Sequence, residues 1–390
     1  MAVEYTLIKL ASRCNFDCTY CYWFRDGSVR KLPALISDAV LKAFVIKLER
    51  HIRRHNLKRF VCSFHGGEPT LYNPARLRVY LAELSAVGER THCQIEYALT
   101  TNGTQISSEW LTLISEYNIA VAVSIDGPPE IHDKRRVTIK GEPTWDETVT
   151  GYFALCERGI RPAIIAVCDP TTDPEKLLDH FFLDLGATYC DVLPPENNHQ
   201  SDNHSISAYY IRLFDHWNTH YRGLGTEVRI LSGFIRGLLG LESRTEIVGF
   251  SSSEIVCLNT NGQLEPHDGL RIAGKEKAET QCNILLNEID DIERDPAWTA
   301  VRDASTDLCE QCSSCRYKVA CGGGHIVHRW SEENGYRNPS IYCSDYQDIL
   351  DHVSVTIGDE ISRGGRDSGS RLLVVRALRS GRPADAVASR

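Results

Sequence analysis

The sequence lacks any apolar run long enough to cross a membrane. No stretch of the 390 residues approaches the ~18 consecutive apolar residues that a membrane span needs. Residues 1–12 carry the acidic Glu4 and lack the extended apolar core of a secretory signal. These absences predict a cytoplasmic protein with no membrane partner.

An excess of basic charge is also missing. The chain has 43 Lys and Arg against 52 Asp and Glu, for a formal net charge of -9. Because a net acidic chain disfavours binding to phosphate backbones, we expect no nucleic-acid partner. The hydrophobic fraction of 42% excludes general disorder. A single core rarely serves more than about 250–300 residues, so the length predicts two or three domains.

Cysteine, by contrast, is abundant, with 15 in the chain. In a reducing compartment, closely spaced cysteines are more often metal ligands or catalytic groups than disulfides. Five scattered cysteines fall mostly in apolar runs and are predicted to pack in the core: Cys62, Cys93, Cys156, Cys168 and Cys190. The others form an N-terminal group and a C-terminal group.

Strands and helices alternate from residue 4 to about 195. Ser37 is a predicted N-cap for the first long amphipathic helix. The predicted strands are 5–10, 59–64, 94–100, 119–125, 161–167 and 188–193. This alternation predicts an α/β fold of parallel βαβ units, either a partial (β/α)6 TIM-like barrel or an open doubly wound sheet. In both folds the chemistry lies at the carboxyl ends of the strands.

Changes in composition suggest four segments. Residues 1–195 are the predicted barrel, 196–253 a helical bridge, 254–350 a cysteine-rich domain, and 351–390 a C-terminal extension that ends in a mobile tail. Within that tail, 372–378 could dock as a short helix.

The N-terminal cysteines form a Cys-x3-Cys-x2-Cys run directly after the first predicted strand: Cys14, Cys18 and Cys21. Three thiolates on one loop can hold three irons of a [4Fe–4S] cube and leave the fourth iron without a protein ligand. The alternative is a zinc site. Structural zinc needs four ligands, however, and no fourth ligand is local.

The string CNFDCTYCYW (14–23) resembles the signature of the radical S-adenosylmethionine (radical SAM) enzymes, with Tyr20 as the aromatic residue before the last cysteine. This resemblance covers about residues 4–195. It implies a [4Fe–4S] cluster whose open iron binds S-adenosylmethionine. In that family, one-electron cleavage of S-adenosylmethionine gives a 5′-deoxyadenosyl radical that abstracts hydrogen from the substrate.

Further motifs follow successive predicted strands: HGGEPT (65–70), TTNGT (100–104), SIDGP (124–128) and IHDKRR (131–136). Glycines let the backbone approach a ligand closely, and a guanidinium suits a carboxylate. With Tyr20, the resemblance implies these S-adenosylmethionine-binding residues: Gly66, Gly67, Glu68, Pro69, Asn102, Ser124, Asp126 and Arg136.

The C-terminal cysteines resemble the SPASM extension of radical SAM enzymes that modify peptides. That resemblance implies an auxiliary [4Fe–4S] cluster bound by Cys312, Cys315, Cys321 and Cys343. A full SPASM domain has thiolates where this chain has His267 and His325. A second auxiliary cluster could use Cys257, Cys282 and Cys309, completed by one of these histidines or by an open iron. A zinc ribbon is the alternative, since the spacing also suits zinc.

Residues 321–346 resemble the FxsB-like maturases, a narrower radical SAM/SPASM branch that forms cyclophanes in ribosomally made peptides. This resemblance implies that the enzyme crosslinks an aromatic side chain of a precursor peptide to a nearby β-carbon, with flavodoxin or ferredoxin as electron donor. The alternatives are formylglycine formation as in anaerobic sulfatase maturases, peptide epimerisation, thioether formation, or a noncatalytic zinc-stapled binding protein.

The sequence motifs do not identify a catalytic base. Asp169 and Glu196 are possible bases, because both lie near the ends of predicted strands. Only 13 residues precede Cys14, fewer than the leader-binding module of about 80–90 residues that many peptide maturases carry. The leader would then bind elsewhere. One candidate surface is the aromatic helix with Tyr209, Tyr210 and Trp217.

Overall fold

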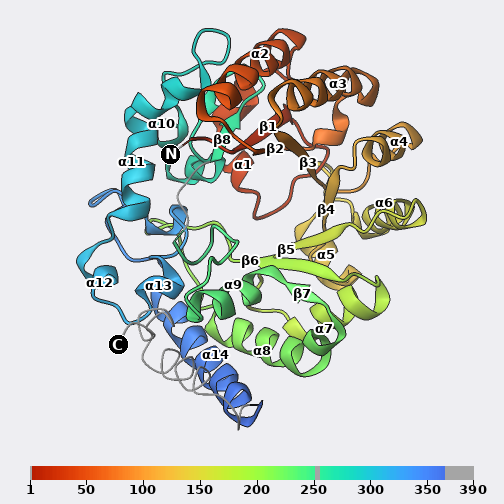
Figure 1. Cartoon of the computed structure of the whole chain (residues 1–390). Helices are drawn as coiled ribbons and strands as arrows, with labels where there is room; N and C mark the ends of the chain where they lie inside the picture. Colours follow the sequence, from red (N-terminus) through yellow and green to blue (C-terminus); the bar gives the residue numbers. More distant parts are fainter. Residues whose placement is uncertain (1, 251–254, 365–390) are drawn as a thin grey trace. The chain divides into compact units, whose positions relative to one another are not determined.

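The computed structural model describes residues 2–250 and 255–364, so the predicted tail helix at 372–378 lies outside the described residues. The chain, whose helices and strands are labelled in Figure 1, divides into two compact units. The first contains residues 1–165 and 253–300, and the second contains 166–252 and 301–390.

A mostly parallel sheet forms the core of the first unit. Its order is β5-β4-β3-β2-β1-β8-β9, and β9 alone in this order pairs antiparallel. The strands are β1 (Tyr5–Ala11), β2 (Arg59–Gly66), β3 (Gln94–Thr101), β4 (Ala120–Ser124), β5 (Ala163–Val167), β8 (Ile255–Leu258) and β9 (Leu264–Glu265). The first five lie within two residues of their predicted limits, and the predicted α/β class is confirmed.

Strand β8 was not predicted from the sequence. It pairs in parallel with β1, so that Tyr5 lies opposite Ile255. Residues from the predicted cysteine-rich segment therefore extend the same sheet as the N-terminal strand.

Helices connect the parallel strands of the first unit. The α-helices of this unit are α1 (Tyr22–Arg25), α2 (Asp38–His55), α3 (Pro74–Thr91), α4 (Ser108–Glu116), α5 (Pro129–Arg135), α6 (Trp145–Glu157) and α10 (Lys275–Ala278). Helix α11 (Pro296–Thr306) begins in the first unit and ends in the second. The 3-10 segments are η1 (Gly27–Lys31), η2 (Pro69–Leu71), η6 (Asp268–Ala273) and η7 (Ile289–Arg294). The predicted cap of α2 is confirmed, because the Ser37 side chain accepts a hydrogen bond from the Val40 N–H at 3.3 Å.

The second unit contains a parallel pair of strands and a set of helices. Its strands are β6 (Tyr189–Leu193) and β7 (Glu227–Val228). Its helices are α7 (Pro174–Asp179), α8 (Ser207–His216), α9 (Arg229–Leu238), α12 (Glu310–Ser313), α13 (Lys318–Cys321) and α14 (Cys343–Gly364). Single helical turns are η3 (His180–Asp184), η4 (Trp217–Tyr221), η5 (Arg222–Leu224) and η8 (Val327–Arg329).

The aromatic side chains of α8 and η4 lie in the core of the second unit. Tyr209, Tyr210 and Trp217 are all buried, and the Tyr210 hydroxyl donates to the Val192 carbonyl at 2.6 Å. Because α8 packs against α14, its aromatic stripe is covered. The suggestion that these residues form an exposed peptide-binding surface is therefore wrong.

The scattered cysteines behave mainly as core residues. Cys156 is partly exposed, whereas the other four are buried: Cys62, Cys93, Cys168 and Cys190. The packing prediction is confirmed for these four.

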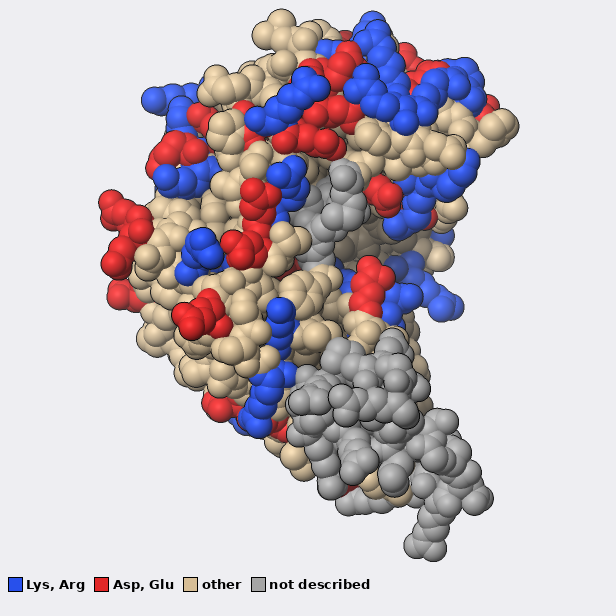
Figure 2. Space-filling view, turned by 60° about the vertical axis from the view of Figure 1, so that its left-hand side comes forward, with Lys and Arg blue, Asp and Glu red and all other residues tan. Residues whose placement is uncertain are grey.

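Charges of both signs lie side by side on the face drawn in Figure 2. Among the surface ion pairs, Glu49 of α2 pairs with Arg53 at 2.7 Å and with Arg90 at 2.6 Å. Such exposed pairs each contribute about 0–1 kcal/mol to stability. Among the helices of residues 2–250 and 255–364, none combines the length and apolarity needed to cross a bilayer.

Candidate active site

Three predicted cluster ligands lie together on the loop that follows β1. Two backbone hydrogen bonds anchor this loop to 135–137: Asp17 N–H to the Val137 carbonyl and Thr19 N–H to the Arg135 carbonyl, both at 2.9 Å. Burial raises the pKa of the Cys14 thiol, and the charges of Glu68, Cys18 and Cys21 raise it further. Bringing three thiolates together therefore requires a compensating positive charge. Three thiolates on one loop with no local fourth ligand fit an iron–sulfur cube with an open iron.

The GGEP segment at the end of β2 packs directly on this cysteine loop. The Gly67 N–H donates to the Ala11 carbonyl and the Glu68 N–H to the Arg13 carbonyl, both at 2.8 Å. A Cβ on Gly66 would lie 2.2 Å from the Ala11 carbonyl oxygen, and one on Gly67 would lie 2.3 Å from that of Arg13. Gly66 and Gly67 therefore let the GGEP segment approach the backbone of Ala11 and Arg13 closely. The motif alone did not reveal this reason for the two glycines.

Glu68 ties the motifs after β2 and β3 together. Its buried carboxylate accepts from the Thr101 hydroxyl and from the Asn102 N–H, both at 2.7 Å. The Asn102 side chain in turn donates to Asn15 of the cysteine loop at 2.9 Å. Glu68 and Asn102 therefore hold the loop in position, whatever contacts they make with a bound ligand.

Three other predicted residues hydrogen-bond to one another. The Tyr20 hydroxyl donates to Asp126 at 2.6 Å, and the Arg136 guanidinium donates to the Tyr20 hydroxyl at 2.6 Å. The Arg135 guanidinium lies 4.4 Å from the centre of the Tyr20 ring, close enough for a cation–π contact. Ser124 ends β4 beside this group and pairs with β5. The site thus combines a carboxylate with two guanidinium groups next to the cysteines.

A buried charge network, missed from the sequence, adjoins the same loop. Lys9 of β1 is 0% exposed and forms an ion pair with Asp268, which opens η6. The Tyr22 hydroxyl, one residue after Cys21, donates to Asp268 at 2.6 Å. The only sequence feature that pointed to this network was a lysine within the apolar run YTLIKL. Its partner, 259 residues away, could not be read from the pattern.

His65 belongs to this network and predicts a pH effect on stability. Burial, followed by the charge of Lys9, lowers the pKa of His65 from 6.5 to about 4. Between these two pH values the unfolded chain binds more protons than the folded chain, so stability falls as pH decreases from 6.5 to 4. Urea unfolding of the anaerobic holoprotein at pH 6.5 and 4.5 should show that wild type loses about 1–3 kcal/mol more than His65→Asn. Equal losses in the two proteins would contradict the predicted effect.

Four C-terminal cysteines line one cavity in the second unit. Cys312, Cys315, Cys321 and Cys343 line it, together with Tyr346. Burial raises the pKa of the Cys321 thiol to about 12, and the charges of Cys343 and Cys315 add to this effect. Four thiols around one cavity fit an auxiliary [4Fe–4S] cluster.

The remaining predicted ligands are divided between the units. Cys257, in β8, and Cys282 are buried in the first unit. Cys309 lies in the second unit, hydrogen-bonded to Cys312. His267 caps η6, with its Nδ1 accepting from the Gly269 N–H at 3.1 Å. A second auxiliary cluster remains a prediction.

Residues 8–183 match the radical SAM superfamily. The cysteine-type anaerobic sulfatase-maturating enzyme of Clostridium perfringens is 26% identical over 366 residues, which is 89% of this chain and 95% of that protein. The serine-type anaerobic sulfatase-maturating enzyme of Bacteroides thetaiotaomicron is 24% identical, covering 90% of this chain and 89% of that protein.

A solved structure supports the same fold. Native anSMEcpe with bound AdoMet and Kp18Cys peptide aligns with a TM-score of 0.79 and 21% identity, over 93% of this chain and 99% of that chain. The narrower FxsB-like subtype remains a prediction. The ordered strand-end motifs, the cysteine loop and the superfamily match agree. Residues 8–183 therefore match the radical SAM superfamily, as the cysteine loop and the strand-end motifs predicted, and the protein is an enzyme that uses S-adenosylmethionine and [4Fe–4S] clusters.

Proposed function

We propose that the enzyme oxidises a Cys or Ser side chain of a polypeptide to formylglycine. The observation that carries this proposal is that the sequence similarity to anaerobic sulfatase-maturating enzymes extends along nearly the whole chain. The sulfatase-maturating relatives align over 89–90% of the chain, which is far more than the 8–183 span of the superfamily match. The main expectation from the sequence, cyclophane formation, has no comparable support.

The chemistry removes one hydrogen atom from the substrate Cβ, one proton from its thiol or hydroxyl, and one electron. With Ser this gives the aldehyde directly. With Cys it gives a thioaldehyde, which water hydrolyses to the aldehyde with release of hydrogen sulfide. The [4Fe–4S] cluster and S-adenosylmethionine would supply the radical for the hydrogen atom. An auxiliary cluster, which Cys312, Cys315, Cys321 and Cys343 would hold, would supply the acceptor for the electron.

The protein must supply an acceptor for the proton. We assign this role to Asp268, because its carboxylate is held next to the cysteine loop by Lys9 and by the Tyr22 hydroxyl. We also propose that Arg136, whose guanidinium donates to the Tyr20 hydroxyl, contacts the carboxylate group of S-adenosylmethionine.

Cyclophane formation is the second candidate. It is favoured by residues 321–346 and by the two histidines at positions where SPASM domains have thiolates, His267 and His325. Ring closure would also remove one hydrogen atom, one proton and one electron, so the two candidates differ in product rather than in redox balance.

Three peptides separate the two candidates. The anaerobic holoenzyme, S-adenosylmethionine and a strong reductant are incubated with a peptide that contains one Cys, the same peptide with Ala at that position, and a Cys- and Ser-free peptide rich in aromatic residues. With the wild-type enzyme, we expect an aldehyde that reacts with a hydrazide only in the Cys peptide. The Asp268→Asn variant should still cleave S-adenosylmethionine but should form little aldehyde from the same peptide. A cyclised aromatic peptide with no aldehyde in the Cys peptide would reject formylglycine formation in favour of crosslinking.

A further inference from the structure

Two groups of histidine and acidic side chains in the described residues have the composition of a metal site. The first contains His51, His55 and Asp290, and the second contains Glu196, His325 and His328. We call the second the Glu196 cluster. All of its members lie in the second unit. Neither group belongs to the cysteine sites described above.

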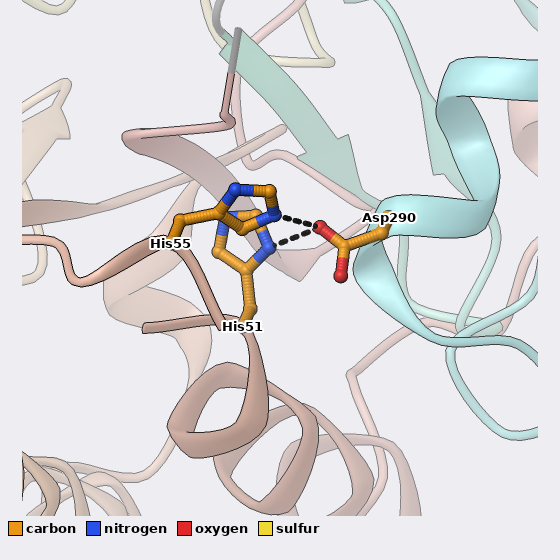
Figure 3. Close-up of side chains that lie close together, drawn as sticks. All are labelled: His51, His55 and Asp290. Carbon is orange, nitrogen blue, oxygen red and sulfur yellow. Dashed lines mark hydrogen bonds and ion pairs between the residues drawn. The ribbon is translucent and has the colours of Figure 1, made fainter. Parts of the chain in front are cut away.

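The His51 group is a hydrogen-bonded ion-pair network. Figure 3 shows both rings directed at the same carboxylate oxygen of Asp290, with His51 Nδ1 at 2.6 Å and His55 Nε2 at 2.8 Å. The second oxygen of Asp290 accepts from Arg54 at 2.6 Å, and His51 Nε2 lies 2.7 Å from the Val3 carbonyl oxygen. These distances are those of hydrogen bonds. The positive charge of the Arg54 guanidinium beside Asp290 also disfavours binding of a metal cation there.

The Glu196 cluster has a different spacing. His325 Nδ1 lies 3.5 Å and His328 Nε2 lies 3.6 Å from the same oxygen, Glu196 Oε2. Both separations exceed ordinary hydrogen-bond lengths. Nitrogen and oxygen ligands lie about 2.0–2.2 Å from zinc, so tetrahedral ligands are about 3.3–3.5 Å apart. Each imidazole nitrogen is therefore spaced from the carboxylate oxygen as two ligands of one ion would be, and all three ligand atoms lie within 4.8 Å of one another.

The local backbone fixes this arrangement. His325 follows three glycines with positive φ, namely Gly322 at 64°, Gly323 at 86° and Gly324 at 76°. Residues other than glycine rarely adopt this backbone conformation. A Cβ on Gly322 would also lie 2.1 Å from the carbonyl oxygen of Gly249. The turn that directs His325 toward Glu196 thus depends on glycine.

The two sides of the cluster are also connected by Tyr342. The His328 ring meets the Tyr342 ring edge-on, with centroids 5.0 Å apart. The Tyr342 hydroxyl donates to the Pro195 carbonyl, the residue before Glu196, at 3.1 Å. Tyr342 therefore sets the position of both the carboxylate and one imidazole.

We propose that the Glu196 cluster binds one divalent first-row transition-metal ion, such as Zn²⁺ or Fe²⁺. Two imidazoles and one carboxylate suit these ions, and three protein ligands leave at least one position for water or a substrate atom. The imidazoles are buried, whereas the Glu196 side chain is 21% exposed. This assignment removes His325 from the candidate ligands of a second iron–sulfur cluster.

The test uses the reconstituted anaerobic holoprotein with Zn²⁺ as the probe. Zinc per chain is counted after desalting, and zinc K-edge absorption reports the ligand type without interference from iron. We expect about one tightly bound zinc with nitrogen and oxygen ligands at about 2.0–2.1 Å. His328→Ala and Glu196→Gln should each weaken zinc binding at least about tenfold while iron and sulfide contents stay unchanged.

The matched control is His55→Ala, which removes a histidine from the other group and should retain the zinc. Sulfur ligands at about 2.3 Å would place the zinc at cysteines and overturn the proposal. Unchanged zinc binding in Glu196→Gln, or loss in His55→Ala alone, would also overturn it. Glu196→Gln keeps the side-chain shape, so it decides the question if His328→Ala does not fold. Because no S-adenosylmethionine or peptide is added, the result is independent of the proposed function.

Discussion

Replacing Cys18 by Ala is expected to lower 5′-deoxyadenosine formation by more than about 100-fold, since losing a direct cluster ligand should cost at least as much as losing one of its supporting partners. Cys18 is the middle cysteine of the loop after β1, and Arg136 lies close enough to act electrostatically on its thiol. With two thiolates left, the loop cannot hold the cube that binds S-adenosylmethionine. The measurement is 5′-deoxyadenosine per chain under strong reductant, together with iron and sulfide contents.

Two cysteine variants serve as comparisons. Cys156→Ala changes a partly exposed cysteine outside both groups and should leave the rate unchanged. Cys315→Ala alters the cavity of the second unit and should keep some cleavage of S-adenosylmethionine while losing peptide product. Wild-type cleavage in Cys18→Ala would refute the assignment of the loop as the cluster site.

Replacing Lys9 by Met is expected to lower the free energy of unfolding by about 3–5 kcal/mol, because it leaves a buried carboxylate without its cation. The Lys9 side chain is 0% exposed and that of Asp268 is 6% exposed. Methionine has an unbranched apolar side chain of similar length but lacks the ammonium, which in the wild type lies 4.3 Å from the centre of the Trp23 ring. Urea unfolding of the anaerobic holoprotein measures the loss.

A second substitution tests the cause of this loss. Lys9→Met combined with Asp268→Asn removes both charges and should recover much of the stability. Arg78→Ala breaks an exposed pair with Glu116, in which the side chains are 40% and 41% exposed, and should cost less than about 1 kcal/mol. If Lys9→Met costs no more than Arg78→Ala, the buried pair does not stabilise the fold as we infer.

The features that the sequence predicted correctly are local ones. β-branched runs alternating with amphipathic helices located the strands within two residues for β1 to β5, and Ser37 marked the start of α2. The cysteine loop and the strand-end motifs were also visible, because all the groups in each motif lie within a few residues. Parallel strands then bring these motifs to one edge of the sheet.

The features that only the tertiary structure decided join residues far apart in the chain. The Lys9–Asp268 pair spans 259 residues, β8 joins the sheet beside β1, and Glu196 meets two histidines of the cysteine-rich segment. An aromatic stripe such as that of α8 is compatible with either a core or a docking surface. In the structure α8 packs against α14, so its aromatic side chains lie in the core. Sequence spacing determines which side chains share one turn or face, whereas contacts between elements depend on how the whole chain packs.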